Sequence, residues 1–112
     1  MARRRLRQGD VWWADLPLGY AWRPVVVLTR DDALSTMSRV TVAVVTSTIR
    51  GIDSGVVLDR EDGVSRRCVV SLDNILTIER HLLDRIETTL GALRMSEVHA
   101  ALAFALDLPR KP

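Results

Sequence analysis

Residues 39–46 read Arg-Val-Thr-Val-Ala-Val-Val-Thr, the most strand-like stretch of this 112-residue chain. Four of these eight residues are Val and two are Thr, and β-branched side chains favour strands because they pack well on a pleated surface. The polar segment 47–51 follows at once and is typical of a loop. The stretch therefore predicts a central strand that ends at Thr46 in an exposed turn.

Other short apolar runs, bounded by Gly, Pro, Asp or Ser, also resemble strands. They are residues 9–16, 25–28, 55–58, 68–72 with a continuation to 78, and 85–90. Helical turns are expected at 31–38 and 79–83. Near the end, Ser96 is a suitable N-cap, apolar residues from Val98 to Leu106 recur at helical spacing, and Pro109 ends the helix. The pattern predicts a mainly β fold with helices (α+β), a small antiparallel barrel or sheet with a C-terminal amphipathic helix.

Length and composition set further limits. At 112 residues, with 47% hydrophobic and 27% charged residues, the chain is expected to form a single domain over residues 1–112, with residues 1–8 as a basic, flexible tail. No run approaches the ~20 apolar residues of a membrane span. No apolar segment follows the basic start, so no signal peptide is predicted and the cytoplasm is the expected location. Of the 16 basic residues, 15 are Arg, which suits nucleic-acid binding but also a GC-rich genome.

Residue types that usually carry chemistry are scarce. The single cysteine, Cys68, lies in an apolar run and is expected to be a buried structural thiol. His81 and His99 are expected at the surface of helical segments, and the acidic turn 59–62 is expected to be solvated. No phosphate-binding glycine loop and no metal-ligand spacing is present. The sequence therefore predicts neither a metal nor another cofactor.

Polar residues at the ends of strands remain as candidates. Arg23 precedes a buried strand, and Thr46 and Ser47 end the strongest one. A guanidinium and a hydroxyl at one rim of a barrel can bind a phosphodiester and stabilise its transition state. A salt-bridged surface arginine and a plain strand end are the alternatives, and spacing alone does not separate them.

Several motifs resemble the MazF/PemK family of toxin endoribonucleases. They are Gly9-Asp10-Val11-Trp12 with Asp15-Leu16, then Arg23-Pro24-Val25-Val26-Val27-Leu28, then Val44-Val45-Thr46-Ser47, and later Asp73-Asn74-Ile75. Their order matches the family over roughly residues 8–108. The resemblance implies an SH3-like barrel, a homodimer, a MazE-like antitoxin as partner and growth inhibition through cleavage of single-stranded RNA. It also implies a metal-independent reaction that leaves a 2′,3′-cyclic phosphate and a 5′-hydroxyl, with Arg23 and Thr46 as the catalytic residues.

Further residues, with Ser47 among them, are candidates for RNA binding. Tyr20 and Trp22 offer aromatic faces on which unpaired bases can stack, for ~1–3 kcal/mol each, although Trp22 can equally pack on the barrel. Arg50, Arg66 and Arg67, in expected turns, can hold the RNA backbone, and a solvated surface is the alternative.

The first loop departs from the family pattern. Many relatives carry a glutamate there, whereas residues 17–22 contain no acidic side chain, so the group that takes the proton is not identified. Arginine is a poor base because its pKa lies above ~12, and Asp15 is a conceivable substitute. Two other functions stay open: a non-catalytic toxin of the same fold that binds a protein such as gyrase, and an RNA- or DNA-binding regulator.

Overall fold

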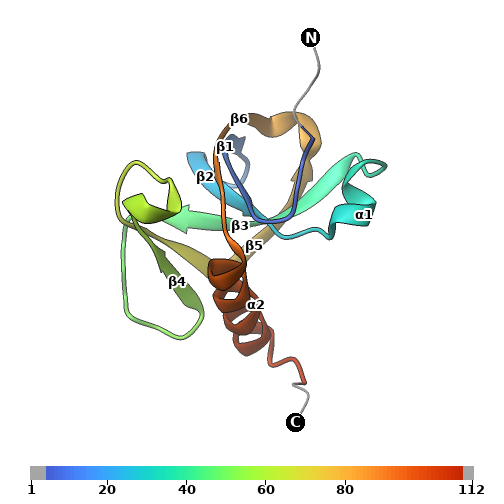
Figure 1. Ribbon diagram of the computed structural model, residues 1–112. Helices are drawn as coiled ribbons and strands as arrows, with labels where there is room; N and C mark the ends of the chain where they lie inside the picture. Colours follow the sequence, from blue (N-terminus) through green and yellow to red (C-terminus); the bar gives the residue numbers. More distant parts are fainter. Residues whose placement is uncertain (1–4, 110–112) are drawn as a thin grey trace.

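The computed structural model describes residues 5–109, which form one six-stranded antiparallel sheet in the order β4-β5-β3-β2-β1-β6. Figure 1 shows the sheet curling on itself, with helix α2 against the part that holds β4 and β5. The elements are β1 (Asp10–Leu16), β2 (Ala21–Val27), α1 (Asp31–Leu34), β3 (Arg39–Thr46), β4 (Gly55–Leu58), the 3-10 turn η1 (Arg60–Asp62), β5 (Cys68–Glu79), the 3-10 turn η2 (Arg80–Leu82), β6 (Leu83–Thr89) and α2 (Ala92–Leu106). The predicted mainly β fold with a C-terminal helix is confirmed.

Strand β3 has the predicted bounds, but β2 begins at Ala21, four residues before the expected strand. Trp22 and Arg23 therefore lie in a strand and pair with Asp15 and Ala14 of β1. The ladder between β2 and β3 starts only at Val25, directly after Pro24, which has no N–H to donate. From Pro24 back to the start of β2, this strand is not paired with β3.

The two faces of the sheet bury separate hydrophobic clusters. Val26, Val45 and Val70 pack on the face that carries Val98 of α2. Alternate residues, such as Val25 and Val44, point to the opposite face and pack with residues that include Leu34 of α1 and Leu6. Only the first of the two faces is covered by α2.

Residues 5–8, the described part of the expected tail, contact the sheet. Leu6 is buried, and the Gln8 backbone N–H donates to Asp31 Oδ1 at 2.7 Å. Residues 1–4 lie outside the described residues. Within residues 5–109 no helix combines the length and the apolarity needed to cross a bilayer.

The Gly9-Asp10 motif has a structural role. Gly9 has φ +91°, and a Cβ there would lie 3.1 Å from Met95 Sδ. Asp10 is fully buried and accepts hydrogen bonds from the Arg7 backbone N–H (3.0 Å) and from Thr89 Oγ1 (2.7 Å). The motif therefore joins the start of the chain to β1, β6 and α2.

The predicted bounds of the final helix are wrong at both ends. The N-cap is Gly91 rather than Ser96, so α2 begins at Ala92. At the other end the last helical residue is Leu106, and Asp107 follows in the left-handed conformation (φ 52°), two residues before Pro109. The Asp107 N–H donates to the carbonyl oxygen of Phe104. Arg94, in the first turn, makes tertiary contacts that local sequence does not reveal.

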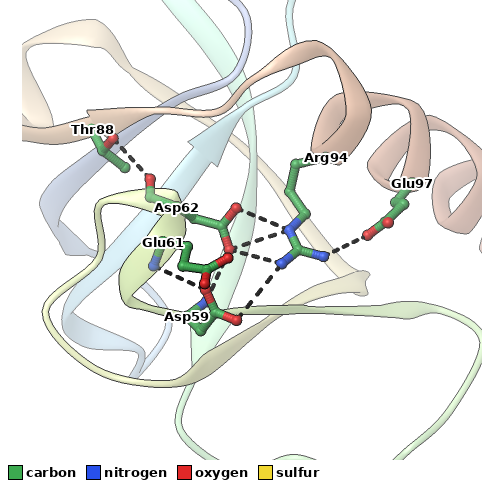
Figure 2. A network of polar contacts seen from close by, with 6 residues as sticks. All are labelled: Asp59, Glu61, Asp62, Thr88, Arg94 and Glu97. Carbon is green, nitrogen blue, oxygen red and sulfur yellow. Dashed lines mark hydrogen bonds and ion pairs between the residues drawn. The ribbon is translucent and has the colours of Figure 1, made fainter.

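The acidic turn 59–62 is not simply solvated, contrary to expectation. Figure 2 shows that Arg94 Nε and Nη2 donate to the Asp62 carboxylate, the shortest bonds being 3.0 Å. Asp59 caps η1 by accepting from the Glu61 N–H, and its own N–H donates to Asp62. We call Asp59, Asp62 and Arg94 the Asp62 clamp. The clamp fixes α2 to the loop that leads into β5.

Candidate functional site

Arg23, near the start of β2, and Thr46, at the end of the neighbouring β3, line the same hollow. The register Val25↔Val44, Val26↔Ala43 and Val27↔Val42 places Arg23 across from Thr46 when it is continued past Pro24. Both residues have the same parity as Val25 and Val44, so both side chains belong to the face without α2. Both are partly exposed. The sheet thus brings together the two residues that the resemblance identifies.

This face carries a hollow of about 370 Å³, which we call the main cleft. Residues of β2, β3, β4 and β5 line it. Its polar side chains come from Tyr20, Arg23, Thr46, Thr48, Arg50, Ser71, Asp73 and Asn74, and its larger apolar side chains from Val44, Ile49, Ile52, Val57 and Val69. Two cations and one carboxylate line it, which favours an anionic ligand.

A chain of hydrogen bonds positions Arg23. Its Nε donates to the carbonyl oxygen of Tyr20 at 2.9 Å. The Tyr20 hydroxyl donates to Asn74 Oδ1 at 3.1 Å, and Asn74 Nδ2 donates to Ser71 Oγ at 2.8 Å. No carboxylate among residues 5–109 forms an ion pair with Arg23. Its guanidinium is therefore oriented by a backbone oxygen, and its charge remains for a ligand.

Thr46 is oriented in a similar way. Its Oγ1 accepts a hydrogen bond from the Thr48 backbone N–H at 3.2 Å. Because a hydroxyl has one proton as well as acceptor sites, Thr46 can still donate to an oxygen in the main cleft.

Sequence reasoning missed how the middle of β5 shapes the cleft. Ala43 pairs with Ile75, but Val44 pairs with Ser71, so residues 72–74 form a bulge. Bulges re-aim side chains and are frequent beside functional sites. Here Asp73 accepts from the buried Ser54 hydroxyl, while Asn74 contacts Tyr20. The signal in the sequence was the polar pair Asp73-Asn74 inside an apolar run.

A second pocket, of about 130 Å³, lies on the opposite face of the sheet. Arg23 and Thr46 line it as well, together with Trp13, Trp22, Pro24, Val45, Ser47, Val64, Ser65, Arg66, Cys68 and Glu87. The Arg23–Thr46 pair thus marks the boundary between the main cleft and the second pocket. The second pocket was not foreseen, because its walls come from distant parts of the chain.

The remaining candidates divide between these two hollows. Tyr20 and Arg50 line the main cleft, whereas Trp22, Ser47 and Arg66 line the second pocket. Arg67 lines neither.

Other residues considered from the sequence lie away from both hollows. Asp15 lines neither hollow, and its strand position directs its side chain to the face opposite the one expected for Arg23, which does not favour a part in proton transfer. His81 and His99 are exposed and line neither hollow, and Cys68 is buried, all as expected. No group of three or more His, Cys, Asp or Glu within residues 5–109 is placed to hold a metal ion.

A curled antiparallel sheet with an arginine and a hydroxyl at one polar cleft defines a class of small β proteins suited to bind a phosphodiester. The model of the PemK-like, MazF-like toxins of type II toxin–antitoxin systems matches residues 7–106. The chain belongs to this family.

Individual relatives agree with this assignment. The probable endoribonuclease MazF5 of Mycobacterium tuberculosis is 38% identical over 92% of this chain and 94% of its own length. The M. tuberculosis toxin MazF-mt6 superposes with a TM-score of 0.83 at 34% identity, over 90% of this chain and 99% of that one. A mycobacterial endoribonuclease in complex with its cognate antitoxin gives a TM-score of 0.84 at 26% identity, over 95% and 99% of the two chains.

Proposed function

We propose that the main cleft is the active site of this protein, a MazF-type toxin endoribonuclease, and that it cleaves single-stranded RNA without a metal ion. The observation that carries the proposal is that Arg23, near the start of β2, and Thr46, at the end of the neighbouring β3, line the same cleft. The two side chains can therefore reach the same phosphate group.

In this mechanism the 2′-hydroxyl oxygen of the RNA attacks the adjacent phosphorus, and the bond from phosphorus to the 5′-oxygen breaks. The products are a 2′,3′-cyclic phosphate and a 5′-hydroxyl, and the proton lost by the 2′-oxygen is balanced by the one gained at the 5′-oxygen. The Arg23 guanidinium stabilises the extra negative charge of the phosphorane, and the Thr46 hydroxyl donates to a phosphoryl oxygen.

The choice of RNA over DNA follows from the need for a 2′-hydroxyl as nucleophile. Tyr20 and Arg50 contact the substrate in the main cleft, Tyr20 by stacking and Arg50 at the backbone. The protein acts in the cytoplasm, where it inhibits translation and growth by cutting RNA. It forms a homodimer. A MazE-like antitoxin binds and neutralises it; an antitoxin as partner is supported by the solved complex of a mycobacterial relative with its cognate antitoxin.

The test is cleavage of a long RNA in EDTA by wild type, Arg23→Ala and Thr46→Val. Wild type yields fragments with 5′-hydroxyl and cyclic-phosphate ends. Loss of Arg23 removes the main charge that meets the transition state, so kcat falls by about 10³-fold or more, and loss of the Thr46 hydroxyl lowers it by about 10²-fold. His99→Ala, on the exposed surface of α2, is the control that leaves the rate unchanged.

Three outcomes contradict the proposal. Cleavage that requires Mg²⁺ would exclude the 2′-hydroxyl mechanism as written. Full activity in both variants would exclude the Arg23–Thr46 pair. An intact RNA that is nonetheless bound by wild type would instead assign the protein as an RNA-binding regulator.

A further inference from the structure

A row of flat side chains crosses the sheet beside the second pocket. The rings of Trp13 and Trp22 are stacked, with centroids 5.7 Å apart and planes 19° from parallel. The Arg85 guanidinium carbon lies 5.7 Å from the centre of the Trp13 ring. Arg85 comes from β6 and Trp22 from β2, the two strands that flank β1, so the Trp13 ring has a neighbour from each side of its strand.

Trp22 is therefore the open end of this row. Its side chain is 45% exposed, which is high for a large aromatic residue. Trp22 and Ser47 both line the second pocket. The free face of Trp22 is a platform on which one more planar group can stack, as unpaired bases do on aromatic side chains.

Glu87 supplies a fixed hydrogen-bond acceptor in the same pocket. Its Oε2 accepts from Trp13 Nε1, and its Oε1 accepts from the Ser65 backbone N–H at 3.1 Å. A carboxylate oxygen can accept two hydrogen bonds, so each oxygen can take one more. No cation among residues 5–109 forms an ion pair with Glu87.

The chemistry of the pocket selects its ligand. A carboxylate repels phosphate but accepts from an amino group, as Glu and Asp do from N4 of cytosine. The volume of about 130 Å³, roughly a third of that of the main cleft, favours a single ring over a purine. Cytosine is the one standard RNA base that combines a single ring with an exocyclic amino group. Ser47 and Arg66, which also line the pocket, add donors for the carbonyl oxygen O2 and the ring nitrogen N3 of cytosine.

We propose that the second pocket is a specificity site for a cytosine next to the cleaved bond, stacked on Trp22 and read at its amino group by Glu87. The proposal rests on the proposed function, because Arg23 and Thr46 line both hollows and so place the phosphate between them. The Asp62 clamp supports the site, since it holds the loop that carries Ser65 and Arg66.

The first test is the map of cut sites that wild type, Trp22→Ala, Trp22→Phe and Glu87→Gln produce in a pool of random RNA. Wild type cuts beside a cytosine at one fixed position. Glu87→Gln accepts cytosine and uracil there alike, because an amide can accept from an amino group or donate to a carbonyl oxygen. Trp22→Phe keeps the wild-type preference.

The second test measures binding of an RNA that carries this sequence and a 2′-deoxy sugar at the cleaved nucleotide, so that it is not cut. Replacing the cytosine by uracil weakens binding to wild type about tenfold, because a carbonyl then faces the carboxylate, and has little effect with Glu87→Gln. Trp22→Ala weakens binding of both RNAs about tenfold through lost stacking, and His99→Ala is the control. Thermal melting of each variant verifies that it is folded.

The outcomes separate the two proposals. Cleavage by wild type with no cytosine within two nucleotides of the cut, or with the same preference in Glu87→Gln, overturns the cytosine site and leaves the endoribonuclease function intact. A wild type that binds the uncut RNA with the predicted cytosine preference but cleaves nothing overturns the function alone. Loss of antitoxin binding in Trp22→Ala with unchanged RNA preference assigns the pocket to the protein partner and overturns the cytosine site.

Discussion

At the scale of single residues, backbone atoms orient the charged and polar groups of the site. Arg23 is held by the Tyr20 carbonyl, Thr46 by the Thr48 N–H, and Glu87 by the Ser65 N–H. Neutral partners orient a side chain without cancelling its charge. The charges of Arg23 and Glu87 therefore remain available, one for a phosphate and the other for a donor group.

The thiol of Cys68, in contrast, is a titratable group whose surroundings disfavour its charged form. Burial, with smaller contributions from the Glu87 and Asp62 carboxylates, raises the pKa of Cys68 to about 11 from 9.0. The higher pKa lowers the thiolate fraction at pH 8 about 100-fold. We expect alkylation of the folded protein by iodoacetamide to be slower by about that factor than in urea, and to accelerate as pH rises toward 11. Equal rates in both conditions would contradict the burial.

Some residues of the site could be predicted from the sequence and others could not. Arg23 and Thr46 follow from family motifs, and continuous Val and Thr residues predict the strand that presents Thr46. The Trp13–Trp22 stack and the role of Glu87 could not be predicted, because they depend on how the strands pair. Trp13 and Glu87, for example, are 74 residues apart in the chain. Pairing across the sheet, not local pattern, creates the second pocket.

At the scale of elements, the Asp62 clamp joins α2 to η1 and so decides where both lie. Asp62 is only 13% exposed and Arg94 28%, so water screens the pair weakly. The hydrogen bonds from Arg94 hold the pKa of Asp62 below its usual value of 3.8. The same contact raises the pKa of Arg94.

Replacing Asp62 by Asn tests the clamp. A carboxyl group whose pKa is lowered by folding stabilises the native state above its usual pKa, and this contribution is lost as pH falls through the lower native value. We expect Asp62→Asn to lower the free energy of unfolding by about 1–3 kcal/mol at pH 7 and the difference from wild type to shrink below pH 3.8. Urea unfolding at pH 7 and pH 3 measures both. Glu61→Gln, exposed in the same turn, is the control, and a deficit equally large at pH 3 would contradict this account.

The clamp also explains why the start of α2 was mispredicted. Ser96 is the better N-cap by residue type, but Arg94 is fixed by Asp62 and Met95 packs on the core. These tertiary contacts extend the helix back to Ala92. The strands, in contrast, were predicted closely where apolar runs meet polar turns. The bulge at residues 72–74 could not be predicted, because a bulge is defined by the pairing of β5 with its neighbour β3.

At the scale of the whole molecule, the outer surface of α2 carries unburied apolar side chains. Leu93 is 79% exposed, Phe104 53% and Leu106 49%. Scattered exposed apolar residues are normal, but a chain of this size gains stability from association. They are consistent with the proposed homodimer.

The dimer predicts a stability that depends on concentration. Because association stabilises only the folded state, Tm rises as the protein concentration is raised from 1 to 100 µM, and light scattering gives a mass of twice 12.5 kDa. A constant Tm together with a mass of 12.5 kDa would show a stable monomer and remove the dimer from the proposal.

The placement of Arg23 and Thr46 between hollows on two faces of the sheet has a consequence for which stretches of RNA can reach the proposed active site. A strand that fills both hollows must turn sharply around the ends of β2 and β3, and a rigid double helix cannot follow that path. Segments folded into hairpins are therefore spared while neighbouring open stretches are cut. How fast an RNA is cleaved then depends on its secondary structure as much as on its nucleotide sequence.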